Sequence, residues 1–592
     1  MKYKYHDKTA PIADNTQSSS VCRKTGKTTS RITGKTARRL LALAVAIMLI
    51  FTGCAGSQTS ADSSTSSVAG TSAETGSATA YDAASKSDMF TERDLSGEYD
   101  EAAALRISLD GTSASIASEG TDTTSAGVSI DGSTITISQE GAYIFSGTLA
   151  DGMIIVDADD SAKVQIVLSG ADITSKTSAA LYVKSADKVF VTAADGTENA
   201  LANGGTFTAI DDSNIDGAVF AKDDITFNGR GNLKVTSPAG HGIVGKDDVK
   251  IAGGILTITA AKHGIQANDS ARFTEADVMI TAGTDGVHVS DNSDAEEGTV
   301  SDSYFYIADA SMTIEAGDDG IHADAQALIE GGSIKVTKSY EGIEALDIEI
   351  SGGNIDVNAT DDGLNAAGGN SAGTEDKTFG EDDWYGNGHG GFSDGGTDGS
   401  IKISGGNTHV TAGGDGIDSN GSLEISGGTT VVEGPSQGDT SVLDFNSTGT
   451  ISGGVFIGTG GAGMAQNFSS AEGQGLIAVS VGSQSAGTTI TLKDSDGNVV
   501  AEQTPELEYS VVYISTPDVK QGGTYTLTAG TYTETIELTD TIYSNISGGF
   551  GGRGGRGPHG NMKPSDGSTD ADTGATEMQP QERMQQSEGN AV

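Results

Sequence analysis

Hydrophobic and polar residues alternate in short runs along most of the chain, and glycine or aspartate interrupts each run. Runs of this kind occupy residues 141–147, 154–156 and 164–168, and similar runs recur as far as residue 460. A period of two with Gly and Asp at the breaks predicts short β-strands joined by tight turns. Longer alternating runs, at residues 488–492, 510–514 and 524–527, predict antiparallel strands, with a hairpin turn at Asp496-Gly-Asn.

The runs belong to a sequence repeat. One element reads Asp/Glu-Gly-Ile/Val/Leu-x-Ala, and a second, such as Ile350-Ser-Gly-Gly, lies between its copies. The shared glycines of the first element are Gly242, Gly264, Gly286, Gly320, Gly342, Gly363 and Gly416. Their spacings are 22, 22, 34, 22, 21 and 53 residues. A unit of about 22 residues therefore repeats, with two longer insertions.

One such unit is too short and too sparsely apolar to bury a core by itself. Stacking the units about 4.8 Å apart would bury their Ile, Val, Leu and Ala residues and pair each backbone with its neighbours. The repeat therefore predicts an all-β protein, a right-handed parallel β-helix with three short strands in each coil. Its corners account for many of the 85 glycines, since a close approach of backbones leaves no room for Cβ.

Changes in composition divide the chain into five parts. The prediction is a signal segment, a Ser/Thr-rich tether, a β-helix, a β-sandwich-like C-terminal domain and a disordered tail, at residues 1–53, 54–88, 89–474, 475–546 and 547–592. Residues 89–129 are expected to cap the first coils of the β-helix.

The N-terminus resembles a bacterial lipoprotein signal. Residues 1–39 contain ten Lys and Arg residues, and an apolar run from Leu40 to Phe51 precedes Cys54. This pattern predicts that Cys54 is lipidated and that the protein is anchored at the extracellular face of the cell membrane. An ordinary secretory signal, giving a secreted protein, and an uncleaved anchor are the alternatives.

The charge excludes some classes of partner. The chain has 82 acidic and 34 basic residues and a net charge of -48, so it is expected to repel nucleic acid. Wholesale disorder does not fit 35% hydrophobic residues arranged in regular runs, and 8 prolines do not fit collagen. Carboxylates in this number indicate divalent cations.

The acids that precede the repeat glycines are the candidate calcium ligands. They fall at one corner of successive coils, where stacked carboxylates repel unless a cation lies between them. Ca²⁺ takes six to eight oxygen ligands, so carboxylates from adjacent coils fit it. The predicted metal ligands are Asp285, Asp318, Asp319, Glu341, Glu344, Asp361, Asp362, Asn365 and Asp415. The alternative is that Asp-Gly pairs only make favourable turns and are solvated.

Two groups of residues are candidates for sugar contacts. His288 and His322 stand two positions after a repeat glycine and are expected to point outward. Trp384, Tyr385 and Phe392 lie in the longer insertion, and aromatic rings on loops stack on sugar faces. A solvated polar face, and rings that fold back onto the coils, are the respective alternatives.

The succession of motifs resembles a known family. Ser339-Tyr-Glu-Gly-Ile-Glu-Ala is followed by Glu349-Ile-Ser-Gly-Gly-Asn-Ile and by Asp361-Asp-Gly-Leu-Asn-Ala. These segments are similar to the calcium-binding, carbohydrate-binding β-helix proteins of clostridia that degrade plant cell walls, over roughly residues 90–460. The resemblance implies a right-handed β-helix, several Ca²⁺ ions, and affinity for polygalacturonate or cellulose, with a lyase-like fold and no established lyase activity.

The sequence favours a non-catalytic function. It contains no zinc-ligand spacing and no recognisable Ser-His-Asp order. The first hypothesis is a monomeric surface protein that binds acidic polysaccharide through Ca²⁺. A calcium-dependent polysaccharide lyase, with Lys262 or Lys338 as base, is the second hypothesis. A surface adhesin or spacer with structural calcium is the third.

Overall fold

The computed structural model describes residues 89–116, 127–290, 303–367, 399–436 and 440–546. Within these ranges the chain is all-β except for one short helix, α3 (Glu92–Ser96). Most of the described strands form one large, mainly parallel 39-stranded sheet, and four form a separate antiparallel sheet. The prediction of an all-β protein is confirmed. No helix in the described ranges is long and apolar enough to cross a membrane.

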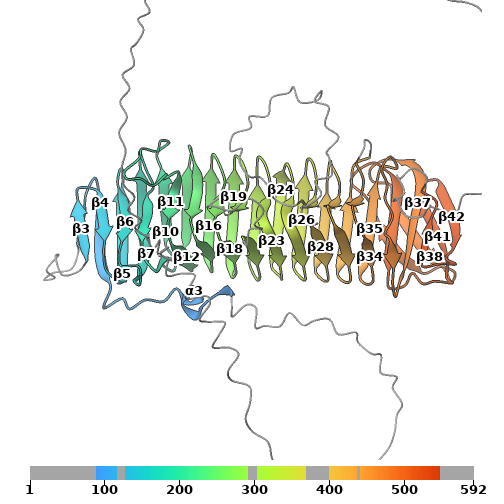
Figure 1. Ribbon diagram of the computed structural model, residues 1–592, viewed down its shortest axis with the longest axis horizontal. Helices are drawn as coiled ribbons and strands as arrows, with labels where there is room; N and C mark the ends of the chain where they lie inside the picture. Colours follow the sequence, from blue (N-terminus) through green and yellow to red (C-terminus); the bar gives the residue numbers. More distant parts are fainter. Residues whose placement is uncertain (1–88, 117–126, 291–302, 368–398, 437–439, 547–592) are drawn as a thin grey trace, which may run out of the picture. The chain divides into compact units, whose positions relative to one another are not determined.

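Pairing in the large sheet follows a simple rule, since most strands pair in parallel with the strand three places further along the chain. For example, β11 (Gly217–Ala221) pairs with β14 (His241–Gly245), which pairs with β17 (Ile265–Ala267). The rule produces three parallel ladders, which we call A, B and C, and their strands follow one another in chain order (Figure 1).

The strands of each ladder are short. Ladder A contains β9 (Lys188–Ala193), β12 (Asp224–Gly229), β15 (Asp248–Ile251), β18 (Ser270–Phe273), β21 (Tyr304–Ile307), β28 (Ser400–Ile403), β31 (Ser422–Ile425), β34 (Gly449–Ile451) and β36 (Ser470–Ala471). Ladder B contains β10 (Glu198–Asn203), β13 (Asn232–Ser237), β16 (Gly254–Ala260), β19 (Ala276–Ala282), β22 (Ser311–Glu315), β24 (Ser333–Ser339), β26 (Asn354–Ala359), β29 (Asn407–Thr411), β32 (Thr429–Glu433) and β35 (Val455–Gly460). Ladder C contains β6 (Met153–Asp157), β8 (Leu181–Ser185), β11, β14, β17, β20 (Val287–Val289), β27 (Leu364–Ala366), β30 (Ile417–Ser419) and β33 (Leu443–Phe445).

Four longer strands belong to two ladders each. They are β5 (Gly141–Leu149), β7 (Lys163–Ser175), β23 (Ile321–Ile329) and β25 (Ile343–Ile350). The first half of β23 pairs with β20 in ladder C, and its second half pairs with β21 in ladder A. These strands turn from one ladder into the next without a loop.

The register reproduces the sequence repeat. Ile243 pairs with Ile265, and Ile265 pairs with Val287, which are steps of 22 residues. All three side chains have 0% exposed surface and belong to one continuous core. The apolar residue that follows each repeat glycine is therefore the inward residue of ladder C, and the predicted stacking of units is confirmed by the pairing.

The repeat glycines are required by close backbone contact. A Cβ on Gly286 would lie 2.5 Å from the carbonyl oxygen of Gly320, and a Cβ on Gly342 would lie 2.2 Å from that of Gly363. Real Cβ atoms do not approach an oxygen so closely. Gly286 N–H meanwhile donates to the Asp319 carbonyl at 2.9 Å, which holds the two coils together.

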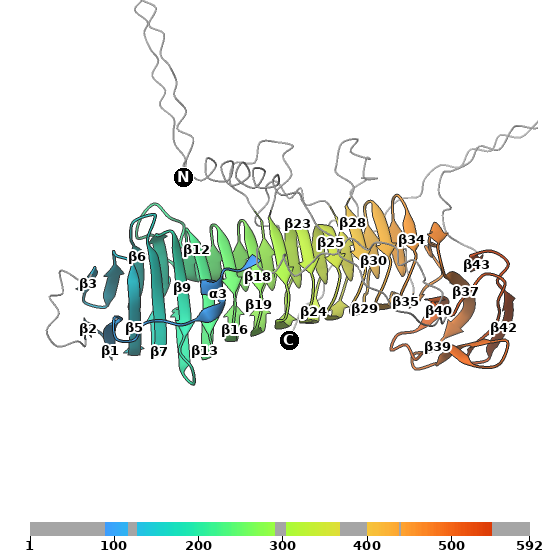
Figure 2. The same ribbon diagram turned by 90° about the horizontal axis from the view of Figure 1, so that it is seen from below.

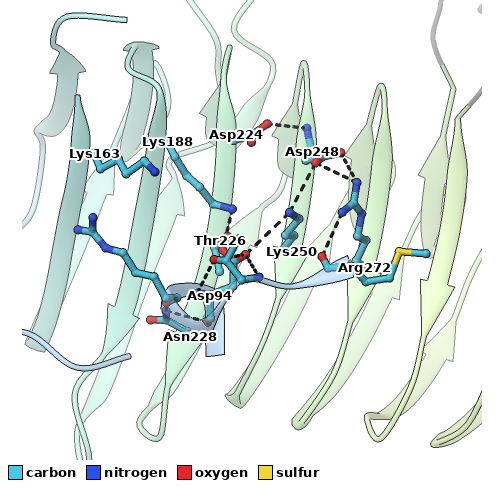
Figure 3. A network of polar contacts seen from close by, with 12 residues as sticks. Asp94, Lys163, Lys188, Asp224, Thr226, Asn228, Asp248, Lys250 and Arg272 are labelled. Carbon is cyan, nitrogen blue, oxygen red and sulfur yellow. Dashed lines mark hydrogen bonds and ion pairs between the residues drawn. The ribbon is translucent and has the colours of Figure 1, made fainter. Parts of the chain in front are cut away.

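The N-terminal segment differs from its predicted role. Strand β1 (Leu105–Gly111) pairs with β5 at the first coils, where β2 (Ala114–Ile116), β3 (Val128–Asp131) and β4 (Thr134–Ile137) form hairpin pairings. Helix α3 is placed elsewhere, because it packs beside β12 on the outer face of ladder A (Figures 1 and 2). Its Asp94 carboxylate binds Lys188 of β9 and accepts from the Thr226 hydroxyl of β12 (Figure 3). Residues 89–98 thus cover the side of the ladder, whereas residues 105–116 lie at its first coils, so only part of the expected cap at residues 89–129 is found there.

The C-terminal residues change to antiparallel pairing. Strand β35 of ladder B pairs antiparallel with β40 (Tyr509–Thr516), which also pairs with β37 (Gly475–Gln484). Strand β43 (Ile542–Ser544) pairs with β37. The separate sheet consists of β38 (Ile490–Asp494), β39 (Val499–Gln503), β41 (Thr524–Ala529) and β42 (Tyr532–Glu537). The predicted hairpin at Asp496-Gly-Asn joins β38 and β39.

Candidate functional site

The predicted calcium ligands gather at the start of the ladder C strands. Stacking the coils arranges the side chains there in three parallel columns. The corner column contains Lys262, Thr284, Asp318, Tyr340, Asp361 and Gly414. The acid column, which directly precedes the repeat glycines, contains His263, Asp285, Asp319, Glu341, Asp362 and Asp415. The strand column contains Gln266, His288, His322, Glu344, Asn365, Asp418 and Asp444.

One oxygen of several column acids has a structural role. Asp285 Oδ1 accepts from the N–H of Asp319 at 3.2 Å, and Asp362 Oδ1 accepts from the N–H of Asp415 at 2.5 Å. Asp415 Oδ1 likewise accepts from the N–H of Ser441. Each bond joins a carboxylate to the next coil. The second oxygen of each carboxylate is left for other contacts.

Asp362, Asp415 and Asp418 form a cluster made only of oxygen ligands, which we call the aspartate cluster. One carboxylate oxygen from each lies within 4.8 Å of the others. None of the ion pairs formed by the described residues includes any of the three. Burial and neighbouring carboxylates raise the pKa of Asp362 to about 6, and burial with the charge of Asp362 raises that of Asp418 to about 7. Like charges therefore oppose one another here without a basic side chain between them.

Gly414 brings the backbone against this cluster. A Cβ at Gly414 would lie 2.3 Å from Asp361 Oδ1 and 2.4 Å from Asp362 Oδ1. The Gly414 N–H donates to the Asp361 carbonyl at 2.9 Å. Glycine thus leaves room for two carboxylates at this corner, where Tyr340 and Asp318 stand on earlier coils.

In the middle of the columns, a histidine offsets the negative charge of the acids. His322 Nδ1 lies 2.6 Å from Glu344 Oε2 and 3.4 Å from Asp319 Oδ2, and its Nε2 lies 3.3 Å from Asp324 Oδ1. Burial opposes protonation of His322, but these three carboxylates raise its pKa well above the usual value. A protonated His322 supplies the positive charge that this group needs. Among the residues that the structure describes, no base pairs with the aspartate cluster in this way.

The early part of the columns contains nitrogen ligands. His263 Nδ1 and His288 Nδ1 lie 3.2 Å and 2.6 Å from the same oxygen, Oδ2 of Asp285. One ligand atom from each of these residues lies within 4.8 Å of the other two. Burial lowers the pKa of His288, so its neutral form, which binds metals, is favoured.

The remaining predicted ligands lie beside these groups. Burial and the charge of Glu344 raise the pKa of Glu341 to about 7, and the Asn365 amide donates to Glu341 Oε2 at 2.7 Å. Burial also raises the pKa of Asp318. His322 is 7% exposed, and its imidazole faces the acid column. His288 faces Asp285 in the same way.

The insertion aromatics, the lipidation site and the two candidate lysine bases are the other residues that the sequence singled out. Trp384, Tyr385, Phe392 and Cys54 lie outside the described residues. Lys262 and Lys338 are both exposed. Of the predicted site residues, the structure therefore describes the column acids, Asn365 and the two histidines.

Sequence reasoning missed two parts of the site. Tyr340 is 40% exposed, stands in the corner column and bonds to Asp361, which raises its pKa to about 12. Its position directly before Glu341 in the repeat could have identified it as part of the site. Asp444 pairs with Asp418 on the neighbouring strand of ladder C. The unit that contains Asp444 has Val442 in place of the repeat glycine. The sequence did not mark Asp444 as part of the column.

A shallow groove on ladder B is lined by both polar and apolar side chains. It has a volume of about 400 Å³ and is lined by residues that include Lys335, Asn354, Asp356, Asn407 and His409. His409 lies 3.3 Å from Asp356 and 3.6 Å from Glu433. Its cations are therefore already paired with acids of the same chain.

Comparisons with known proteins find one protein family that is similar to part of the chain. Residues 131–377 match the profile of a family described as carbohydrate-binding domain-containing proteins. This segment is thus similar to carbohydrate-binding domain-containing proteins. It contains the acid column as far as Asp362, and Asp415 and Asp418 lie beyond it.

One curated relative and one solved structure are similar to parts of the chain. A carbohydrate-binding domain-containing protein of Acetivibrio thermocellus is 40% identical over 122 residues, which cover 20% of this chain and 43% of that protein. The chain thus matches less than half the length of this relative. The solved structure is a gadolinium derivative of the polysaccharide lyase-like protein from C. thermocellum, at 29% identity and a TM-score of 0.34. The match covers 45% of this chain and 98% of that one.

Proposed function

We propose that the protein is a non-catalytic polysaccharide-binding protein that uses Ca²⁺ held by the aspartate cluster. The observation that carries the proposal is the position of Asp362, Asp415 and Asp418, whose oxygens lie within 4.8 Å of one another with no ion-pair partner in the described ranges. A Ca²⁺ ion has Ca–O distances of about 2.3–2.6 Å, so two oxygens on opposite sides of it lie about 4.8 Å apart. The cation would remove the repulsion that raises the pKa values of these acids.

The ligand would complete the coordination of the ion. Ca²⁺ takes six to eight oxygens, and one oxygen each of Asp362 and Asp415 is already bonded to a backbone N–H. Positions therefore remain for water and for a carboxylate of the ligand. An acidic polysaccharide such as polygalacturonate offers one carboxylate on each sugar. Calcium would bridge two groups of the same charge, a protein acid and a uronate.

Tyr340 would supply the apolar part of the contact. Its ring is 40% exposed and lies in the corner column next to the acids. Sugar rings pack their C–H faces on such aromatic side chains. The family match of residues 131–377 to carbohydrate-binding domain-containing proteins supports the same class of ligand.

The proposal includes the arrangement of the whole chain. The three ladders would wind as a right-handed parallel β-helix, the hand that parallel crossover connections almost always adopt. Lipidation at Cys54 would hold the protein at the extracellular face of the membrane. Asp361, Asn365, Asp318, Glu341 and Asp319 would add oxygens near the ion or bind further ions along the columns.

The test is Ca²⁺ binding and polysaccharide retention by the full chain after treatment with a chelator. Asp418→Asn should weaken Ca²⁺ binding by calorimetry at least tenfold and abolish calcium-dependent retention in a polygalacturonate affinity gel. The matched control is Glu424→Gln, which removes an exposed acid from β31 of the same coil and should leave both unchanged.

Three results would overturn the proposal. Retention that persists in chelator would remove the calcium requirement. Equal Ca²⁺ affinity in the Asp418→Asn and Glu424→Gln variants would place the ion elsewhere. Rising ultraviolet absorbance from unsaturated products, followed in the same samples, would make the protein a lyase.

A further inference from the structure

Four imidazoles stack along the site columns. The ring centroids of His241 and His263, of His263 and His288, and of His288 and His322 are 4.9, 4.4 and 4.8 Å apart, with interplanar angles of 21°, 17° and 11°. The stack changes column at its centre, because His263 precedes its repeat glycine and His288 follows its own. The two rings at this change face the Asp285 carboxylate from adjacent coils.

Asp285 is held in a fixed position. Its side chain is 6% exposed, and its Oδ1 accepts from the N–H of Asp319 at 3.2 Å. Its Oδ2 faces His263 Nδ1 at 3.2 Å and His288 Nδ1 at 2.6 Å. Three potential metal ligands, two nitrogens and one oxygen, therefore converge on one point.

His263 Nδ1 acts as an acceptor. The N–H of Asp285 donates to it at 3.3 Å, and the Thr284 hydroxyl lies 2.9 Å away. The same backbone N–H donates to a carboxylate on other coils, as Asp319 N–H does to Asp285. The lone pair of His263 Nδ1 thus lies 3.2 Å from a carboxylate oxygen, another acceptor. Two acceptors at this distance in a covered site repel each other, and either a proton on Nδ1 or a metal ion between the two atoms would remove the repulsion.

We propose that His263 Nδ1, His288 Nδ1 and Asp285 Oδ2 bind a transition-metal ion of the Zn²⁺ class. Imidazole nitrogens suit Zn²⁺, Cu²⁺ and Ni²⁺, whereas Ca²⁺ selects oxygen ligands. Tetrahedral ligands at about 2.0–2.1 Å from Zn²⁺ lie about 3.3–3.4 Å apart, which matches the spacing of His263 Nδ1 and Asp285 Oδ2. The two rings stack with their planes 17° apart, so both would turn to direct their Nδ1 lone pairs at one ion.

The surroundings have the features of a metal site. The N–H of Asp319 orients the Asp285 carboxylate from the next coil, as second-layer donors orient metal ligands. The His288 side chain is 20% exposed, which leaves a side open for water as fourth ligand. Because His263 precedes β17 and Asp285 precedes β20, the ion would join two consecutive coils. This site goes beyond the calcium proposal, since it differs in ligands, in metal class and in coils.

The experiment uses the full chain, stripped of metals and free of any polyhistidine tag. Zn²⁺ binding is measured by calorimetry, and Cu²⁺ serves as a paramagnetic probe of nitrogen ligands. The wild-type Cu²⁺ spectrum should show coupling to two imidazole nitrogens. His288→Gln should reduce the coupling to one nitrogen and weaken Zn²⁺ binding at least tenfold. His409→Gln, which alters a half-exposed histidine of β29, should change neither.

Each alternative result overturns the proposal. A wild-type Cu²⁺ spectrum with oxygen ligands only, which does not depend on how any variant folds, would exclude the site. Equal Zn²⁺ affinity in the His288→Gln and His409→Gln variants would place the ion elsewhere. Asp418→Asn separates this site from the calcium site, because it should retain Zn²⁺ binding. Loss of Zn²⁺ binding in Asp418→Asn would show one shared site and refute a separate one.

Discussion

The Nζ atom of Lys188 lies 2.6 Å from Oδ1 of Asp94, a side chain with no exposed surface. Asp94 belongs to α3, and its carboxylate also accepts from the Thr226 hydroxyl at 2.8 Å and lies 3.9 Å from Lys250 (Figure 3). Three strands of ladder A are thus connected through one carboxylate that lies far from them in sequence. Helix α3 fastens the N-terminal segment to the side of the ladder.

Asp94→Asn should destabilise the protein strongly. The variant leaves Lys188 without its partner in a covered position, and breaking a buried pair in this way costs about 3–5 kcal/mol. Chemical denaturation measures the free energy of unfolding. The control, Asp187→Asn, breaks the pair with Lys163 at 3.6 Å, whose side chains are 36% and 48% exposed. It should cost less than about 1 kcal/mol, and an equal loss in both variants would contradict the role of Asp94.

Acid should weaken the same contact. Burial opposes ionisation of Asp94, but the charge of Lys188 and its hydrogen bond lower the pKa to about 2, against 3.8 for the free side chain. A lowered pKa gives stability that is present above about pH 4 and is lost as the pH falls towards 2. The difference amounts to about 2.5 kcal/mol at about 1.4 kcal/mol per pKa unit. Unfolding measured from pH 5 to pH 2 should show this loss in the wild type, and Asp94→Asn should show a shallower slope.

Gly286→Ala should destabilise the coils. The added Cβ would lie 2.5 Å from the Gly320 carbonyl oxygen, and backbone atoms of two paired coils cannot move apart locally. Overpacking of this kind costs about 1–3 kcal/mol. Gly331→Ala is the control, because the nearest atom to its Cβ would be 3.7 Å away. Thermal unfolding should separate the two variants, and equal melting temperatures would refute the packing argument.

Gly414→Ala should weaken both cation binding and stability. Its Cβ would meet Oδ1 of Asp361 and of Asp362, at 2.3 and 2.4 Å, and the backbone carbonyl carbon of Asp361 at 2.8 Å. The displaced carboxylates would no longer converge on the aspartate cluster, and the backbone of the neighbouring coil would have to shift. Calorimetry should show Ca²⁺ affinity lowered about tenfold, and the melting temperature of the metal-free protein should fall. Unchanged affinity would mean that Asp361 and Asp362 do not bind the ion.

Tyr340→Ala should reduce polysaccharide retention without changing Ca²⁺ affinity. The ring is 40% exposed, so its loss should leave no buried cavity. Aromatic packing contributes about 0.5–1.5 kcal/mol, which corresponds to a roughly two- to thirteenfold weaker retention in an affinity gel. Tyr340→Phe keeps the ring and should behave like the wild type. Full retention by the alanine variant would exclude Tyr340 from the binding surface.

The repeat allowed much of the fold to be predicted from the sequence. Ile243, Ile265 and Val287 recur at the interval that brings them into register, and the glycine before each is fixed by the next coil. The spacing of the repeat along the sequence therefore predicts which residues pair between neighbouring strands. The aspartates of the site could be predicted for the same reason, because Asp362 and Asp415 occupy equal positions in the repeat.

Contacts outside the repeat could not be predicted. Asp94 reaches Thr226 across 132 residues, and the Thr91–Asp94 capping box indicates a helix start without indicating where the helix packs. The covered state of His322 also depends on its surroundings, since Asp324, Glu344 and Asp319 all approach its ring. Its position after a repeat glycine indicates the direction of the side chain and not what lies around it.

The antiparallel pairing of β35 with β40 has a consequence for assembly. A parallel ladder ends in a row of free N–H and C=O groups, which can template the addition of another chain. Strand β40 occupies that row on ladder B, with Phe456 paired to Ser515 and Gly460 to Val511. The reversed direction of β40 also offers the wrong polarity for a further parallel coil. The C-terminal strands thus terminate ladder B and protect it from end-to-end polymerisation into fibres.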